Sequence, residues 1–173
     1  MPAEHLAGPA TAGTTPAPPH RAPDDSQVVL AHIMSDHDTN LYGTVHGGTV
    51  MKLIDDAAAA AAGRHAGTTA VTVSVEDMRF LTPVRTGDLL TVRARLDDAG
   101  RTSMQVGVEV TAERWNATGP TALVATGHLV FVAVDDEGHP VPVPELRPVT
   151  EDDLRRRRRA AERRERRGAG ESG

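Results

Sequence analysis

The chain has 173 residues, a formal net charge of −5 and no cysteine. This length suits one domain with a sizeable core, and the absence of cysteine excludes disulfides, thiolate metal sites and a cysteine nucleophile. Aromatic residues make up only 2%, which predicts a core of Val, Ala and Leu and disfavours base-stacking nucleic-acid modules. No apolar run is long enough to span a membrane and the N-terminus lacks signal-peptide features, so we expect a cytoplasmic protein.

The two ends of the chain differ from its body in composition. Residues 1–25 hold six prolines and few large apolar side chains, which cannot offset the entropy of ordering, and we expect a disordered tail. Residues 150–173 predict an arginine-rich helix or tail that starts with a capping Thr150. Its nine arginines give residues 151–173 a net charge of +3 and leave −8 for the rest. We interpret this run as a solvated face or a loose polyanion contact, with nucleic-acid binding disfavoured.

Residues 26–149 predict one domain that begins with a strand and a long helix. The strand candidate covers residues 28–33. The helix candidate covers residues 46–65, where apolar residues recur at the spacing of one buried face and residues 57–62 are all alanine. Because alanine combines high helix propensity with little bulk, a sheet can wrap closely around such a helix.

Antiparallel strands are predicted over most of residues 69–134. Apolar and polar residues alternate around Val71–Val75, Leu90–Leu96 and Val106–Val110, with turn residues between the segments. The last candidate, residues 122–134, contains the apolar run Leu129–Val134, which predicts cover on both faces. We therefore expect an α+β fold in which a curved antiparallel sheet of five to six strands wraps a long central helix.

Two features of the predicted helix could carry chemistry. Gly47 and Gly48 at its start would expose backbone N–H groups that can polarise a carbonyl or hold an oxyanion. Asp55 and Asp56 border the apolar face, where a carboxylate is a candidate base or nucleophile. Both acids lie roughly 130° from the centre of that face, on opposite flanks, so the pattern does not choose between them. Paired glycines that form only a turn, and acids that are only solvated, are the plainer interpretations.

The distance between these features indicates how they could act together. Gly47 and Asp55 are eight residues apart, roughly 12 Å along a helix axis, which is too far for both to act on one carbonyl. If both act, they must come from two chains. A two-fold dimer with antiparallel central helices would bring Gly47 of one chain beside Asp55 of the other.

Several motifs between Ser26 and Pro144 occur in an order typical of one family. They are Asp38-Thr39-Asn40, Gly43, His46-Gly47-Gly48, Lys52–Ala57, Val75-Glu76, Phe80–Val84 and Gly87-Asp88. Together they resemble the hotdog-fold acyl-CoA thioesterases, specifically the cytosolic acyl-CoA hydrolase group. The resemblance implies a hotdog fold and hydrolysis of acyl-CoA to free fatty acid and CoA, without a metal or any cofactor beyond the CoA of the substrate.

The resemblance also assigns roles to residues. Asp55 matches the catalytic carboxylate, acting as base or as nucleophile through an anhydride, and Gly47 matches the N–H donor to the thioester carbonyl. Asn40 matches the asparagine that completes the site across a subunit interface, with His46 and Gly48 in support. The turn Arg101, Thr102 and Ser103 resembles the one that meets the CoA phosphates. The resemblance implies a homodimer, usually within a trimer of dimers.

Other questions and alternatives stay open at this level. Some relatives place a serine near the catalytic acid, and the aligned residues here are Thr72 and Val73, so a role for Thr72 is unsettled. A hotdog hydratase or dehydratase would use the local pair Asp38 and His46. A non-catalytic acyl-CoA sensor could contact DNA through the arginine run. The histidines show no HExxH metal spacing, and the acyl chain length is undetermined.

Overall fold

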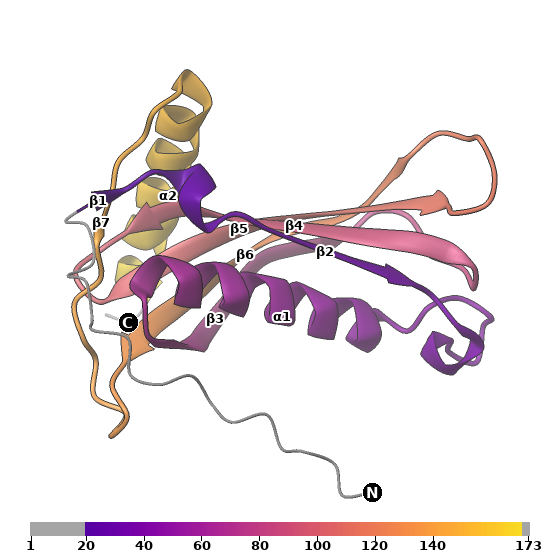
Figure 1. The fold of residues 1–173 in the computed structure, drawn as a ribbon, viewed down its shortest axis with the longest axis horizontal. Helices are drawn as coiled ribbons and strands as arrows, with labels where there is room; N and C mark the ends of the chain where they lie inside the picture. Colours follow the sequence, from indigo (N-terminus) through magenta and orange to yellow (C-terminus); the bar gives the residue numbers. More distant parts are fainter. Residues whose placement is uncertain (1–19, 171–173) are drawn as a thin grey trace, which may run out of the picture.

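The fold places one long helix against the hollow face of a curved antiparallel sheet (Figure 1). The computed structural model describes residues 20–170. Helix α1 spans Gly47–Ala66 and helix α2 spans Glu151–Gly170. The five strands of the sheet lie in the order β2-β4-β5-β6-β3. Their bounds are β2 Val28–Ile33, β3 Thr69–Phe80, β4 Asp88–Ala99, β5 Ser103–Arg114 and β6 Ala122–Val134. The predicted α+β fold, with a sheet of five to six strands around a long helix, is thereby confirmed, and the sheet has five strands.

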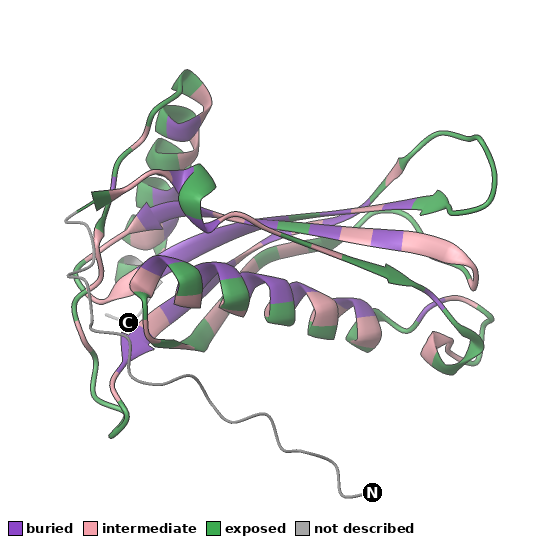
Figure 2. Ribbon diagram, viewed as in Figure 1, coloured by how far each residue is buried: buried purple, intermediate pink, exposed green. Residues whose placement is uncertain are grey.

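Helix α1 begins and ends where its flanking residues dictate. His46 is the N-cap, and Gly67 ends the helix with a left-handed φ of 73°, a conformation that glycine adopts at little cost. Apart from His65, the buried side chains of α1 are small or branched, and they are Val50, Ile54, Ala57, Ala58, Ala61 and Ala62. Figure 2 shows this buried stripe against the sheet and an exposed opposite side. The alanine run thus allows the sheet to approach the helix closely.

The strand interiors follow the predicted alternation except at one sheet edge. The apolar positions of β4 and β5, such as Leu90 and Val106, are buried under α1. In β3, however, Val71, Val73 and Val75 remain 42%, 56% and 45% exposed. Strand β3 pairs only with β6, so its other edge and these valines have no cover within the described chain. Exposed apolar edge strands are candidates for pairing with another chain.

The ordered structure starts earlier than the composition predicts. Residues 1–19 of the expected disordered tail lie outside the described residues. Residues 20–25 contradict that expectation: strand β1 (His20–Arg21) pairs in parallel with β7 (Glu145–Leu146), and η1 (Pro23–Ser26) follows directly. Pro23 is buried, and its fixed φ lowers the entropy lost on ordering. A proline-rich composition therefore misplaced this boundary.

Helix α2 packs on the outward face of the sheet, so the interpretation of its arginines as merely solvated is wrong. Arg163 is only 6% exposed and donates a hydrogen bond to the Asp97 carboxylate of β4 at 3.0 Å. Arg156 lies 3.3 Å from the other Asp97 oxygen, and Arg164 lies 2.7 Å from Asp98. A buried carboxylate is costly without a cationic partner, and α2 supplies these partners.

Within residues 20–170, no helix is both long and apolar enough to cross a membrane.

Candidate active site

The start of α1 presents one free backbone donor. His46 caps the helix by accepting a hydrogen bond at Nδ1 from the Gly48 N–H, at 3.0 Å. The following N–H groups, of Thr49 and Val50, bond to the His46 carbonyl. Among the described residues the Gly47 N–H has no acceptor, and a Cβ at Gly47 would meet nothing within 4 Å. Gly47 is thus an open donor at the positive end of a helix dipole.

The loop before the helix is organised by Asn40. Its Oδ1 accepts hydrogen bonds from the N–H groups of Tyr42 at 2.8 Å and Thr44 at 3.3 Å. Its Nδ2 donates to the Thr44 hydroxyl at 3.0 Å. A bridge between Thr39 and Val45 closes the loop directly ahead of α1. Asn40 and Gly47 therefore lie at the same end of the helix, and in the single chain the Asn40 amide shapes its own loop.

Asp55 and Asp56 have different surroundings, which the helical pattern could not show. The hydroxyl of Thr72 in β3 donates a hydrogen bond to Asp55 Oδ1 at 2.8 Å, and Asp55 is half-buried. Asp56 is exposed and forms an i,i+4 ion pair with Lys52 at 2.6 Å. The carboxylate that faces the sheet is thus Asp55, with Oδ1 held by Thr72, while Asp56 is engaged at the surface.

An apolar cavity of about 300 Å³ opens beside the helix start. Gly47 lines it together with Val50 of α1, and the opposite wall comes from Leu81, Pro83 and neighbouring residues after β3. In the sequence Phe80–Val84 stands out only as a motif, and nothing in its pattern predicts that it forms a pocket wall. Apolar pockets with a few polar groups at the mouth are typical of small-molecule sites. The free Gly47 donor therefore faces a space suited to an apolar chain.

The expected CoA-binding turn lies away from the helix start. Strand β2 ends next to the start of β4, through the pair Ile33–Leu89, and leads into the loop before α1. The turn of Arg101, Thr102 and Ser103 follows the other end of β4 and so lies at the opposite end of the sheet from Gly47 (Figure 1). Arg101 is exposed. One chain therefore does not bring this turn and the Gly47 donor together.

The alternative pair for hydratase chemistry does not form. Asp38 accepts hydrogen bonds from the Ser35 hydroxyl and N–H, both at 2.7 Å, and these bonds hold the pKa of the Asp38 carboxyl below its usual value. The imidazole of His46 bonds to Gly48 instead, and His46 meets Asp38 only through its backbone N–H, at 2.7 Å. The two side chains therefore do not act as an acid–base pair.

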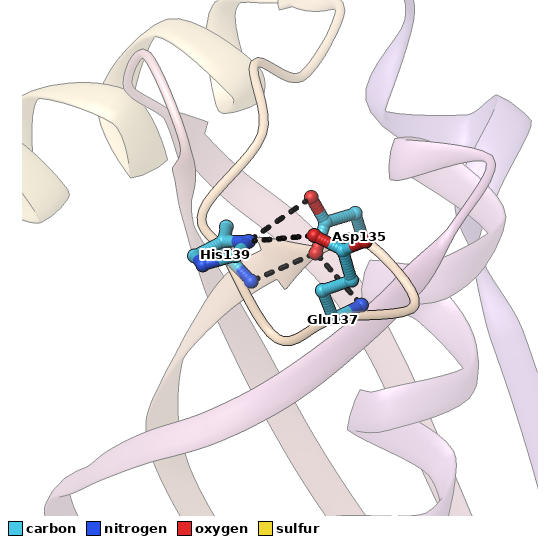
Figure 3. A group of neighbouring side chains, drawn as sticks. All are labelled: Asp135, Glu137 and His139. Atoms are coloured by element: carbon cyan, nitrogen blue, oxygen red, sulfur yellow. Dashed lines mark hydrogen bonds and ion pairs between the residues drawn. The ribbon is translucent and has the colours of Figure 1, made fainter.

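One exposed group of potential metal ligands occurs within residues 20–170, formed by Asp135, Glu137 and His139 (Figure 3). Asp135 Oδ1 accepts hydrogen bonds from the N–H groups of Glu137 at 3.0 Å and His139 at 2.8 Å. These bonds are those of an Asx turn. Turn formation accounts for the cluster, which lies in the connection after β6.

Comparison with known proteins defines the class. Residues 42–114 match the family model of the thioesterase superfamily. The uncharacterized acyl-CoA thioester hydrolase YkhA of Bacillus subtilis is 38% identical over 130 residues, which cover 75% of each protein. The rat cytosolic acyl coenzyme A thioester hydrolase is 36% identical over 132 residues, covering 76% of this chain and 35% of the rat protein. The chain thus spans about a third of that relative's length.

Solved structures agree with this class. An acyl-CoA hydrolase from Staphylococcus aureus in complex with butyryl coenzyme A has a TM-score of 0.80 and 36% identity, over 88% of this chain and 93% of that one. An apo-hexameric acyl-CoA thioesterase has a TM-score of 0.83 and 35% identity, over 87% and 96%. The chain belongs to the acyl-CoA thioester hydrolases of the thioesterase superfamily, and the predicted hotdog fold is confirmed.

Residue spacing connects this chain to the Staphylococcus aureus enzyme in more detail. Three structures of that enzyme carry single alanine substitutions, of an asparagine, an aspartate and a threonine. There the aspartate follows the asparagine by 15 residues and the threonine follows the aspartate by 17. Asn40, Asp55 and Thr72 show the same two separations. In this chain the last two of these residues share a hydrogen bond.

Proposed function

We propose that this protein hydrolyses acyl-CoA thioesters to a free fatty acid and CoA. The observation that carries the proposal is the half-buried Asp55 carboxylate held by the Thr72 hydroxyl, on the same helix as the free Gly47 N–H. A thioester hydrolase needs a carboxylate to activate water or to attack, and a donor where charge develops on the carbonyl oxygen. The residue spacing shared with the substituted Staphylococcus aureus enzyme supports the choice of Asn40, Asp55 and Thr72.

The proposed site is shared between two chains. Gly47 and Asp55 are separated by roughly 12 Å along α1, so one substrate carbonyl cannot meet both in a single subunit. The β3 edge with its exposed valines, uncovered within residues 20–170, offers a surface for a second copy. We propose a homodimer in which Gly47 faces Asp55 of the partner subunit. Further assembly to a hexamer is supported by the similarity to the apo-hexameric acyl-CoA thioesterase.

The chemistry follows from these positions. The thioester carbonyl oxygen accepts a hydrogen bond from the Gly47 N–H, and the acyl chain lies in the apolar cavity next to it. Water attacks the carbonyl carbon and gives its proton to Asp55. The C–S bond then breaks, and the CoA thiolate takes up a proton. In the second possible route the Asp55 oxygen attacks the carbonyl itself and forms an anhydride, which water hydrolyses.

The remaining parts of the site have supporting roles. His46 holds the helix start through Gly48, and Asn40 orders the loop that would meet the neighbouring subunit. Arg101, Thr102 and Ser103 would meet the CoA phosphates, because an exposed arginine in a turn can bind phosphate through two N–H groups. CoA is part of the substrate, and no other cofactor enters the reaction. We place the enzyme in the cytoplasm, by its similarity to the cytosolic acyl coenzyme A thioester hydrolase of the rat.

Release of CoA thiol from a series of acyl-CoA lengths tests the proposal. The Asp55→Asn variant should lose turnover for every substrate while keeping the oligomeric mass of the wild type in light scattering. The neighbouring Asp56→Asn variant is the matched control, since Asp56 is engaged in a surface ion pair with Lys52. Turnover that persists in Asp55→Asn, or that is lost only in Asp56→Asn, would overturn the assignment.

A further inference from the structure

A second cavity, of about 370 Å³, lies on the outward face of the sheet under helix α2. We call it the outer pocket. One wall comes from side chains of β4, among them Arg93 and Asp97, and the other from α2, among them Arg156, Arg159 and Arg163. In β4 the buried Leu90, Val92, Ala94 and Leu96 face α1, so the alternating positions that line this pocket face the other way. The outer pocket is therefore separated by the sheet from Asp55 and Thr72.

The lining of the outer pocket has an excess of positive charge. It contains six arginines against three carboxylates, within a chain whose net charge is −5. Two of the carboxylates are occupied: Asp97 pairs with Arg156 and Arg163, and Asp152 pairs with Arg155 and Arg156. The third, Glu109, is the cross-strand neighbour of Arg93 but forms no ion pair with it in the described part of the chain. Arg95 pairs with Asp24 and Asp153, which lie outside the lining. The charge that stays without a partner is therefore that of the lining arginines that no carboxylate meets.

Two arginines of the lining have no side-chain partner in the structure described. Within residues 20–170, Arg93 and Arg159 form neither an ion pair nor a side-chain hydrogen bond. They come from the two opposite walls, β4 and α2, and both are exposed at the pocket. A concave site with unpaired cations concentrates anions, and the planar guanidinium matches phosphate oxygens with two parallel hydrogen bonds. The free donors of Arg93 and Arg159 therefore suit a phosphate group.

The volume of the outer pocket and its Glu109 side chain indicate which kind of ligand it can bind. Its volume lies within the range of small-molecule pockets, about 300–1,000 Å³, and exceeds what a single inorganic phosphate fills. Glu109 accepts hydrogen bonds only, which suits hydroxyl or amino groups beside the phosphate. We propose that the outer pocket binds a small phosphate-bearing molecule of nucleotide size, through Arg93 and Arg159. This site does not depend on the proposed hydrolase activity.

Isothermal titration of the full chain with ADP and with pyrophosphate, at low ionic strength, tests this proposal. We expect saturable binding of ADP that weakens as salt is added. The double variant Arg93→Gln/Arg159→Gln should weaken it by about a hundredfold, roughly tenfold for each arginine removed. Arg158→Gln is the matched control, because Arg158 is the exposed neighbour of Arg159 on α2 and does not line the pocket. It should bind ADP as the wild type does.

Two further measurements, thermal melts and the acyl-CoA KM of the double variant, distinguish the possible outcomes. Within residues 20–170 neither Arg93 nor Arg159 has a side-chain partner to lose, so thermal melts without ligand should show that the double variant is folded. Absence of saturable binding to both ADP and pyrophosphate would overturn the proposal, as would equal weakening in Arg158→Gln. An acyl-CoA KM that rises with the double variant would identify the bound phosphate as that of CoA. An unchanged KM together with lost ADP binding would identify a separate ligand.

Discussion

The Thr72 hydroxyl of strand β3 donates a hydrogen bond to the Asp55 carboxylate of helix α1, at 2.8 Å. Within residues 20–170, this contact joins the central helix to a sheet edge that lacks a neighbouring strand. It holds Oδ1 of Asp55, so Oδ2 is the oxygen available to accept a proton from water. We therefore expect Thr72 to act as a positioning residue for the proposed reaction.

Replacing Thr72 tests this role. Thr72→Val keeps the shape of the side chain and removes the donor, and we expect kcat for acyl-CoA hydrolysis to fall about 10- to 100-fold, as for loss of a hydrogen bond to a charged group. The acyl-CoA KM should change little, because the hydroxyl contacts Asp55 rather than substrate. Thr72→Ser keeps a hydroxyl and should retain most of the activity. Equal activity in the Val and Ser variants would show that the bond has no part in turnover.

Gly47→Pro tests the proposed carbonyl donor. Proline is well accepted at the first position of a helix and removes only its N–H, and His46 already has the extended backbone that a residue before proline prefers. We expect kcat to fall about 100- to 1,000-fold, the usual effect of losing one oxyanion donor. Gly47→Ala keeps the N–H and has open space for its Cβ, so it should lose far less. Steady-state kinetics with circular dichroism as a folding check separate the two variants.

The buried ion pair between Arg163 and Asp97 should dominate the contribution of α2 to stability. Arg163→Met leaves the Asp97 carboxylate short of a partner at a site where both side chains are almost inaccessible, and we expect a loss of about 3–5 kcal/mol in the free energy of unfolding. Arg166→Met removes an exposed pair with Asp77 on the same helix and should cost less than about 1 kcal/mol. Urea unfolding measures both. Similar losses in the two variants would contradict this assignment.

Two histidines, the buried His65 and the half-buried His128, should make stability fall as the solution becomes acidic. Burial lowers the pKa of His65, and burial together with the neighbouring Arg163 lowers the pKa of His128. The unfolded chain therefore binds protons near pH 6.5, while the folded chain does so only at lower pH. We expect the free energy of unfolding to be highest above about pH 6.5 and to decline as the pH drops below it. Denaturant titrations from neutral to mildly acidic pH check this, and His128→Gln should reduce the slope.

Helix α2 shows why the sequence alone did not predict that some of its arginines are buried. Asp153, Arg156, Ala160 and Arg163 recur at helical spacing, and such a stripe can mark a buried face even when it is charged. The partner of Arg156 and Arg163 is Asp97, which lies more than fifty residues earlier, on β4. The charge of an arginine predicts solvent exposure unless an acid is known to lie opposite. Only the packing of α2 on the sheet reveals that acid.

The sequence by itself determined the central helix, the strand alternation and the small core with few aromatic residues. It also determined that Gly47 and Asp55 lie far apart along α1. These depend on local periodicity and on fixed rise per residue, which a single chain segment already contains. The tertiary structure decided that Asp55, and not Asp56, faces the sheet, because the packing of β3 beside α1 brings the Thr72 hydroxyl to Asp55 and leaves Asp56 at the surface. The tertiary structure also decided that α2 covers the outward face of the sheet, since contacts between segments distant in sequence form only when the sheet is assembled.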